Sequence, residues 1–293
     1  MSYPKNRNVS QAEKNAVEGG VLYLVATPIG NLADISERAL KVLSEVDFIA
    51  AEDTRNTGRM LAHFGISKPM LSYFEHNKRE RGEVIVSRIE AGESCALVTD
   101  AGTPAISDPG EDIVRLCHER DIRVTSIPGC CAAITALTLS GLTTGRFTFE
   151  GFIGTSKSER RERLAELSTE RRTMIFYEAP HRLRETLADL CSSFGGEREL
   201  ALCREITKLN EEVCRTTLAG AVELYAEREP RGEYVLVVSG AAKAEVAADY
   251  PDDPVEHVEQ LIAGGMTKME AIKAVARLRG VPKNDIYDLF IVG

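Results

Sequence analysis

Short apolar, β-branched segments alternate with amphipathic segments of helical length, and this alternation constrains the fold more than any other feature of the sequence. From residue 21 onward the pattern predicts five strands, at residues 21–27, 47–53, 69–74, 95–100 and 123–128. Most segments between them are long enough to cross over a sheet as helices. The pattern therefore predicts a parallel sheet covered by helices.

The same pattern restarts after a turn-rich stretch at residues 141–145. Five further strands are predicted, at residues 147–152, 173–177, 200–205, 212–218 and 234–239. Only one short helical segment, residues 220–226, lies among the last three strands, so we expect these to pair antiparallel. We therefore predict an α/β fold with two α/β domains, at residues 21–145 and 146–240.

The two ends of the chain differ from these domains. Residues 1–20 are polar and are predicted to form a flexible tail. Residues 241–254 are acidic, rich in Ala and bounded by Pro, which is typical of a linker. A small helical module is expected at residues 255–293, with Gly280 as a helix C-cap. Its basic residues suit either contact with RNA or a capping bundle, and the sequence leaves both open.

Composition argues against several classes of protein. Hydrophobic residues at 43% and charged residues at 28% are ordinary for a globular chain of 293 residues. The longest apolar runs fall far short of the roughly 20 residues that cross a membrane, and the N-terminus lacks the apolar core of a secretion signal. Seven cysteines without a CxxC pair indicate neither a disulfide framework nor a zinc site. We expect a cytoplasmic protein that holds no metal.

The net charge of −9 is not typical of a nucleic-acid-binding protein, but the charge is unevenly distributed. Basic residues outnumber acidic ones in residues 77–88 and 157–184, whereas acids concentrate in residues 243–259. The overall charge therefore does not exclude RNA binding at a local basic face.

Polar and turn-forming residues follow several of the predicted strands. Ligands of open α/β sheets bind outside the carboxyl ends of the strands, so these residues are candidates for a site. Helix capping accounts for some of them. It does not account for acid–base pairs at the same edge, such as Asp53 with Arg55 and Glu178 with Arg182.

The loop at residues 100–110, DAGTPAISDPG, carries the most information. Gly102 allows close approach of the backbone, and Asp100 and Thr103 offer a carboxylate and a hydroxyl at the edge of the sheet. Such a loop suits a ligand with an adenosine ribose and an amino-acid tail. The motifs GxGxxG, GxxxxGKS/T, HExxH and GxSxG are absent, which argues against dinucleotide redox, P-loop, zinc protease and serine esterase chemistry.

Seven segments match one family in order across residues 22–240: LVATPIGNLADISERAL, AEDTRNTGRML, LVTDAGTPAISDPG, IPGCCAAITALTLSGL, FYEAPHRL, REITKLNEE and RGEYVLVVSG. The sequence resembles the ribosomal RNA small subunit methyltransferase I family, among the tetrapyrrole-methylase-like enzymes that use S-adenosylmethionine. The resemblance implies two α/β domains of the tetrapyrrole methylase type with the cofactor in the cleft between them, and a homodimer. It also implies methylation of a cytidine ribose 2′-hydroxyl in the decoding region of 16S rRNA in the small ribosomal subunit.

The matching motifs imply which residues hold S-adenosylmethionine: Pro28, Asp100, Ala101, Gly102, Thr103, Ile106, Cys131, Ala132 and Tyr177. Two positions depart from the related pattern. Thr103 stands where related tetrapyrrole methylases have Asp, and Cys130 stands where family members often have Pro. The first departure leaves Asp100 to supply the acidic contact.

Methyl transfer to a ribose oxygen depends on alignment, and a general base would add to the rate. The candidate catalytic residues are Glu52, Asp53, Arg55 and His76, with Asp53 and Arg55 as the favoured substrate-side pair. The residues expected to hold RNA phosphates are Lys157, Arg160, Arg161, Arg182 and Arg204.

Two alternative functions stay open. One is a methylase of the same fold that acts on a tetrapyrrole precursor or a diphthine-type residue, and the other is a ribosome-assembly factor that binds the cofactor without turnover.

Overall fold

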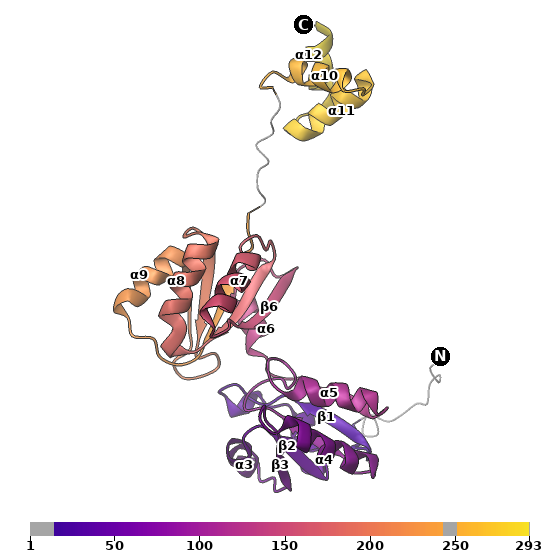
Figure 1. The fold of residues 1–293 in the computed structure, drawn as a ribbon, viewed down its shortest axis with the longest axis vertical. Helices are drawn as coiled ribbons and strands as arrows, with labels where there is room; N and C mark the ends of the chain where they lie inside the picture. The colour runs from indigo at the N-terminus through magenta and orange to yellow at the C-terminus, as the bar shows by residue number, and fades with distance from the viewer. Residues whose placement is uncertain (1–14, 243–250, 293) are drawn as a thin grey trace. The chain divides into compact units, whose positions relative to one another are not determined.

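The computed structural model describes residues 15–242 and 251–292. Contacts divide the chain into two compact units, Met1–Ala241 and Ala242–Gly293. The first unit holds both sheets, and the described residues of the second form helices (Figure 1). The predicted tail and linker fall mostly on residues 1–14 and 243–250, outside the described part, so their boundaries stay predictions.

The first sheet has five parallel strands in the order β3-β2-β4-β1-β5. Its strands are β1 (Val21–Val25), β2 (Phe48–Ala51), β3 (Met70–Ser72), β4 (Cys95–Val98) and β5 (Arg123–Ile127). Each strand lies inside a segment that the sequence predicts as a strand. The prediction of a parallel sheet is confirmed.

Helices cover both faces of the first sheet. They are α2 (Glu37–Glu45) and α3 (Thr54–His63) on one face, and α4 (Lys78–Glu90) and α5 (Gly110–Glu119) on the other. Along β1, Val21 and Tyr23 pack with α2 and α3, whereas Leu22 between them packs with α4 and α5. Successive side chains of a strand point to opposite faces, so a strand buried on both sides must be apolar throughout.

The second sheet is mixed, in the order β6-β7-β10-β8-β9. Its strands are β6 (Phe147–Phe152), β7 (Thr173–Glu178), β8 (Glu199–Arg204), β9 (Glu212–Thr217) and β10 (Tyr234–Val238). β6 and β7 are parallel, and the other neighbours are antiparallel. The predicted antiparallel pairing of the last three strands is confirmed.

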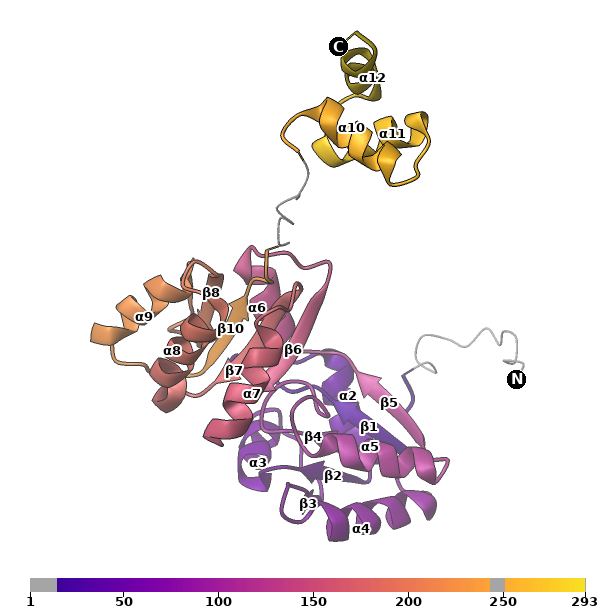
Figure 2. The same cartoon turned by 45° about the horizontal axis from the view of Figure 1, so that its top comes forward.

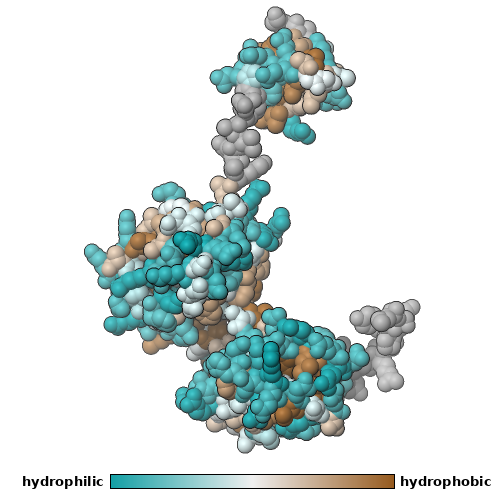
Figure 3. Space-filling view, in the orientation of Figure 1, coloured by the Kyte–Doolittle hydropathy of each residue, from teal (hydrophilic) through white to brown (hydrophobic). Residues whose placement is uncertain are grey.

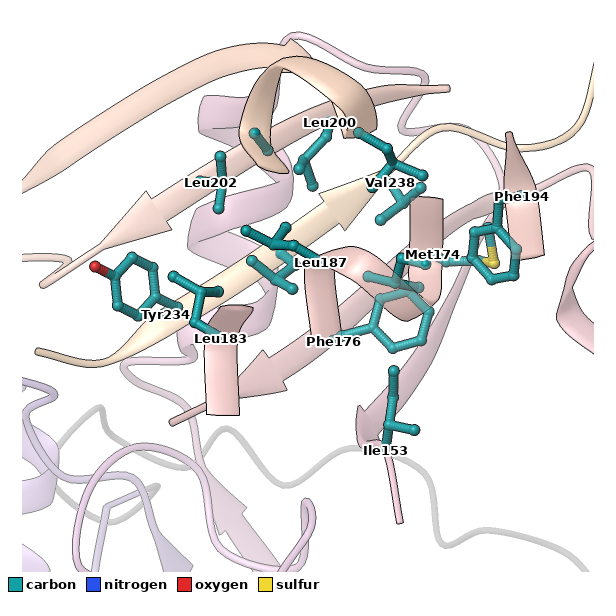
Figure 4. Close-up of a cluster of buried hydrophobic side chains, with 14 of the residues drawn as sticks. Ile153, Met174, Phe176, Leu183, Leu187, Phe194, Leu200, Leu202, Tyr234 and Val238 are labelled. Carbon is teal, nitrogen blue, oxygen red and sulfur yellow. The ribbon is translucent and has the colours of Figure 1, made fainter. Parts of the chain in front are cut away.

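The second sheet is also covered on both faces. Three helices, α7 (Lys157–Leu167), α8 (Leu183–Phe194) and α9 (Leu218–Glu227), cover one face, and α6 (Ala132–Ser140) covers the other. Figure 2 shows α7 and α8 lying over the sheet. The core beneath them includes Met174 and Phe176 from β7 and Leu183 and Leu187 from α8, which point toward one another in Figure 4.

The strand order places β1 beside β4 at a point where the chain changes faces. The helix that follows β1, α2, packs on one face of the first sheet, and the helix that follows β4, α5, packs on the other. Two backbone hydrogen bonds join the loops that leave these strands, because Thr27 N donates to Gly102 O (2.9 Å) and Gly102 N donates to Thr27 O (3.0 Å). Ligands of open α/β sheets bind at such a point.

The second unit consists of α10 (Pro254–Ala263), α11 (Lys268–Arg279) and α12 (Lys283–Val292). Val258, Ile272 and Ile286, one from each helix, are buried in its own core. Gly280 ends α11 in the left-handed region with φ 66°, as the sequence predicts for a C-cap.

Within the described residues, no helix is long and apolar enough to cross a membrane. The face seen in Figure 3 is largely hydrophilic, with apolar side chains in small patches.

Candidate functional site

A cavity of about 510 Å³ lies in the first unit, lined by loops at the carboxyl edge of the first sheet and by residues of the second sheet. Eight of the nine predicted cofactor residues line it: Asp100, Ala101, Gly102, Thr103, Ile106, Cys131, Ala132 and Tyr177. Glu52 from the predicted catalytic set also lines it. Pro28 does not line it, although its neighbour Ile29 does. The structure therefore brings together motifs that are far apart in the sequence.

The loops around the cavity are held by short polar contacts. The Thr103 hydroxyl donates to the Cys130 carbonyl (2.9 Å), so the two positions that depart from the related pattern contact each other. Gly102 has φ 85°, and a Cβ there would lie 3.3 Å from Ile29 Cγ2. A side chain at Gly102 would therefore strain the backbone and crowd the cavity wall.

Tyr177 ties the second sheet to the start of α6. Its hydroxyl accepts a hydrogen bond from the backbone N–H of Ala133 (3.2 Å), and its ring packs edge-on against Phe149 and Phe152, with centroids 5.1 and 5.6 Å away. Burial raises the pKa of Tyr177 to about 12, so the phenol stays protonated at neutral pH. Tyr177 thus presents a rigid aromatic wall to the cavity.

Carboxylates gather on the first-sheet side of the cavity. Asp108 Oδ1 accepts hydrogen bonds from Ala105 N (3.0 Å) and Gly110 N (2.7 Å), whereas its buried Oδ2 has no partner in the described structure. Burial raises the pKa of Asp108, and burial followed by the charge of Glu52 raises the pKa of Asp100. This side of the cavity favours a positively charged ligand, because a cation would compensate these desolvated carboxylates.

Three predicted catalytic residues, Asp53, Arg55 and His76, lie outside the cavity lining, so their catalytic roles stay predictions. Asp53 is the N-cap of α3 and pairs with Arg55 (Nη2 to Oδ2 2.8 Å), whose side chain is 82% exposed. Hydrogen bonds from Arg55 lower the pKa of Asp53 to about 2, which makes it a weak base. His76 packs edge-on against Phe74 beyond β3, at the edge of the first sheet.

The predicted pair of Glu178 and Arg182 does not form. Glu178 is buried and accepts from the Thr186 hydroxyl, whereas the Arg182 guanidinium donates to the backbone carbonyls of Ile153 (2.9 Å) and Gly154 (3.0 Å). Thr186, in the helix that follows β7, satisfies Glu178, whereas the loop that follows β6 satisfies Arg182. Glu178 still lines the cavity, but without its predicted partner.

The predicted RNA-binding residues divide into exposed and committed side chains. Lys157 and Arg161 are exposed on α7. Arg160 is only 4% exposed and its guanidinium donates to Thr186 and Asp189, so it is a structural residue and its prediction is wrong. Arg204 is paired with Glu212 across β8 and β9 (2.9 Å), which likewise commits it to the sheet.

Several cavity residues have no counterpart in the sequence prediction: Ile29, Ser107, Asp108, Phe152, Ala179, Pro180, Ile206, Lys208, Glu233, Tyr234 and Val235. Most belong to motifs that the sequence shows, REITKLNEE and RGEYVLVVSG among them, but strand order alone brings those motifs to this edge.

A second cavity, of about 480 Å³, lies between α4 and α5 and contains none of the predicted cofactor residues. Among the described residues, no group of three His, Cys, Asp or Glu side chains is arranged to hold a metal.

Comparison with known proteins identifies the family. A family model described as Tetrapyrrole (Corrin/Porphyrin) Methylases matches residues 21–222. Proteins named Ribosomal RNA small subunit methyltransferase I are similar over nearly the whole chain. That of Halalkalibacterium halodurans is 47% identical over 283 residues, covering 96% of this chain and 98% of the relative. That of Synechocystis sp. is 46% identical over 270 residues, covering 92% and 97%.

Solved structures show the same fold at lower identity. Diphthine synthase aligns with a TM-score of 0.59 and 15% identity over 75% of this chain and 90% of its own. Uroporphyrin-III-C-methyltransferase from Thermus thermophilus aligns with a TM-score of 0.55 and 20% identity over 75% and 94%. These likenesses concern the fold, and they confirm the predicted tetrapyrrole methylase architecture. The chain therefore belongs to the tetrapyrrole methylase family and, within it, to the ribosomal RNA small subunit methyltransferase I group.

Proposed function

We propose that this chain transfers a methyl group from S-adenosylmethionine to the ribose 2′-hydroxyl of the cytidine at position 1402 of 16S rRNA. One observation carries the proposal. The DAGTP, PGCCA and FYEAP motifs, which characterise the sequence of this group, converge on a single cavity with carboxylates on one side. The relatives that span nearly the whole chain are named as methyltransferases of small-subunit ribosomal RNA.

The residues around the cavity fit S-adenosylmethionine. The cofactor carries a positively charged sulfur and an ammonium group, and Asp100 and Asp108 offer carboxylates that are partly desolvated. The unpartnered Oδ2 of Asp108 leaves room for one further donor. Ile106, Ala132 and Tyr177 supply apolar surface for an adenine ring. When bound, the cofactor supplies an electrophilic methyl group.

The chain's own contribution to the reaction is alignment and removal of a proton. A ribose hydroxyl is a weak acid, so a base beside it contributes roughly 10² to 10⁴ in rate. Of the predicted catalytic residues, Glu52 is the one that lines the cavity, where Oε2 accepts from the Thr99 hydroxyl (2.7 Å). We assign the role of base to Glu52, because Asp53 and His76 lie outside the cavity lining.

Exposed cations on α7 are the proposed RNA contacts. Lys157 and Arg161 lie on the solvent side of α7, where phosphate binding requires no rearrangement of the core. The target ribose must be unpaired or splayed out to enter the cavity, so the proposed substrate is the folded small subunit in the cytoplasm rather than naked RNA.

We also propose that the protein is a homodimer formed through α6. This helix carries no charged residue, and Ile134 and Leu139 are exposed although the opposite face packs on the second sheet. Exposed apolar side chains on an uncharged helix favour contact with another protein surface. A second copy of the chain would cover the exposed face.

Transfer of tritium from labelled S-adenosylmethionine to purified, undermethylated small subunits tests the proposed function. We expect label in 16S rRNA at the ribose of a single cytidine. Label in uroporphyrinogen or a diphthine precursor without label in ribosomes would contradict the RNA assignment. Binding of S-adenosylhomocysteine without transfer to any of these acceptors would support an assembly factor instead.

A further inference from the structure

Lys208 is a cation in a cavity that is otherwise acidic. Among the described residues that line the cavity, it is the one with a basic side chain, while Asp100, Asp108 and Glu233 are acidic. It lies in the loop between β8 and β9, which belongs to the second sheet, whereas Asp100 and Asp108 follow β4 in the first sheet. Lys208 therefore places a positive charge on the second-sheet side of the cavity, where Glu178 and Glu233 are acidic.

The loop holds Lys208 in a defined position. Glu205 and Thr207 both adopt the left-handed region, with φ 51° and 66°, which non-glycine residues rarely do. Lys208 Nζ donates to Glu205 Oε1 (2.8 Å), and the same oxygen accepts from Glu233 N (3.0 Å). Strained backbone of this kind persists where the surroundings over-determine it, and it is concentrated at functional sites.

Two glycines leave the space that this loop occupies. A Cβ on Gly232 would lie 2.5 Å from Glu205 Cγ, and a Cβ on Gly30 would lie 2.4 Å from Lys208 Cγ. The stem of Lys208 thus packs against the loop that follows β1, so both sheets contribute to its position. A lysine that is only a solvated surface charge would not need this fit.

The two carboxylates that contact Lys208 differ in exposure. Glu205 is 18% exposed and lies beneath the ammonium group, whereas Glu233 is 81% exposed, with Oε2 at 2.7 Å from Nζ. Exposed ion pairs contribute little to stability, so an incoming anion can replace Glu233 at small cost. Glu205 would keep the lysine in place during this exchange.

We propose that Lys208 binds a backbone phosphate of the acceptor RNA beside the target ribose, in place of Glu233. This inference rests on the proposed function. It separates the roles of the two sides of the cavity: the carboxylates of the first sheet face a cationic methyl donor, and Lys208 of the second sheet faces the anionic acceptor.

The charge state of Lys208 agrees with this role. Burial lowers the pKa of its ammonium group, but hydrogen bonds to Glu205 and Glu233 outweigh that effect and raise the pKa above its ordinary value. The lysine therefore stays protonated throughout the neutral range. It acts as a cation rather than as a base.

Binding of the full-length protein to purified small subunits at several salt concentrations tests the inference. Loss of one phosphate contact lowers the slope of log affinity against log salt by about 0.7 to 0.9. We expect this change, with about tenfold weaker binding at low salt, in Lys208→Ala. Lys41→Ala is the matched control, because Lys41 pairs with Glu45 on α2 and lies outside the cavity lining. The control should keep the wild-type slope.

A second variant tests the exchange itself. Glu233→Gln removes the competing carboxylate, so we expect about two- to fivefold tighter binding to small subunits, and no gain when Lys208→Ala is also present. A gain of the same size in both backgrounds would overturn the inference. So would an unchanged salt slope in Lys208→Ala.

A measurement of cofactor affinity distinguishes failure of this inference from failure of the proposed function. Affinity for S-adenosylhomocysteine, measured by calorimetry, should be the same in Lys208→Ala as in the wild type. A large loss there, with an unchanged salt slope, would mean that Lys208 serves the carboxylate of the cofactor, and the inference fails while the function stands. Absence of tritium transfer by the wild-type protein would instead contradict the proposed function.

Discussion

At the scale of single residues, the site is built from groups that are unfavourable for folding. Asp108 places a carboxylate oxygen in a buried position without a partner, and Ala105 and Ser107 beside it both have φ 65°. Each left-handed non-glycine residue costs on the order of 1 kcal/mol or more. These features reduce stability but leave the loop preorganised for a cationic ligand.

Asp100→Ala is predicted to abolish affinity for the cofactor. The Asp100 carboxylate lines the cavity and is partly desolvated, so its loss removes a charged contact that solvent does not replace. Calorimetry with S-adenosylhomocysteine measures the effect. Asp112→Ala is the control and should bind normally, because Asp112 is half-buried on α5, pairs with Lys78 and lies outside this cavity. Unchanged binding by Asp100→Ala would refute the assignment of the site.

Asp108→Asn is predicted to stabilise the protein in a pH-dependent manner. Since burial raises the folded-state pKa of Asp108, ionisation of this carboxyl lowers the free energy of unfolding as the pH rises through that pKa. The penalty is absent below the unfolded pKa of about 3.9. Asn keeps the acceptor for Ala105 N and Gly110 N.

We therefore expect Asp108→Asn to melt about 2 to 4 °C higher at pH 7.5, the shift produced by 1 kcal/mol in a protein of this size, and no higher at pH 3.5. Scanning calorimetry at both pH values measures it. A gain of equal size at both values would show that the charge of Asp108 is not the cause.

At the scale of secondary-structure elements, a buried polar chain joins three of them. Glu178 at the end of β7 accepts from Thr186 of α8, which in turn accepts from Arg160 of α7 (2.8 Å). Arg160 also pairs with Asp189 of α8. The chain fixes the position of Glu178, which lines the cavity, from the far side of the second sheet.

Arg160→Ala is predicted to reduce the free energy of unfolding by about 2 to 3 kcal/mol, because it leaves Thr186 and Asp189 without their cation. Arg161→Ala is the matched control, since Arg161 is the adjacent exposed residue of α7, and it should change stability by less than about 0.5 kcal/mol. Urea denaturation measures both. RNA binding should show the reverse pattern. The slope of log affinity for small subunits against log salt should become shallower in Arg161→Ala and stay unchanged in Arg160→Ala.

At the scale of the whole molecule, charged and apolar surface residues are concentrated on particular elements rather than spread evenly. The net charge is −9, yet the proposed RNA contacts are exposed cations on α7 and Lys208 in the cavity. The uncharged helix α6 presents apolar side chains on its outer face. A single property such as net charge therefore does not describe the partners of this protein.

Ile134→Lys is predicted to convert the proposed dimer to a monomer, because it places a charge in the centre of the exposed face of α6. Sedimentation velocity measures the change. Leu224→Lys, at another exposed apolar position, on α9, should leave the dimer intact. A monomeric wild-type protein would rule out this surface as a permanent interface.

The sequence by itself determined the elements of this protein. Strand and helix periodicity depends on neighbouring residues, and every described strand lies within one residue of its predicted segment. The family resemblance could imply a cofactor site at the DAGTP loop and Tyr177, because the motifs that carry it are contiguous in the chain. Gly280 could be assigned to a C-cap for the same reason.

Only the tertiary structure decided which of these residues meet. Lys208 and Glu233 reach the cavity because β8 and β10 are neighbours in the second sheet, and that pairing depends on contacts between residues far apart in the chain. The burial of Arg160 depends on how α7 packs against α8, whereas its neighbour Arg161 differs by one helical step and is exposed. Local patterns cannot distinguish these two arginines, since the face that a helix buries is set by the partner on which it packs.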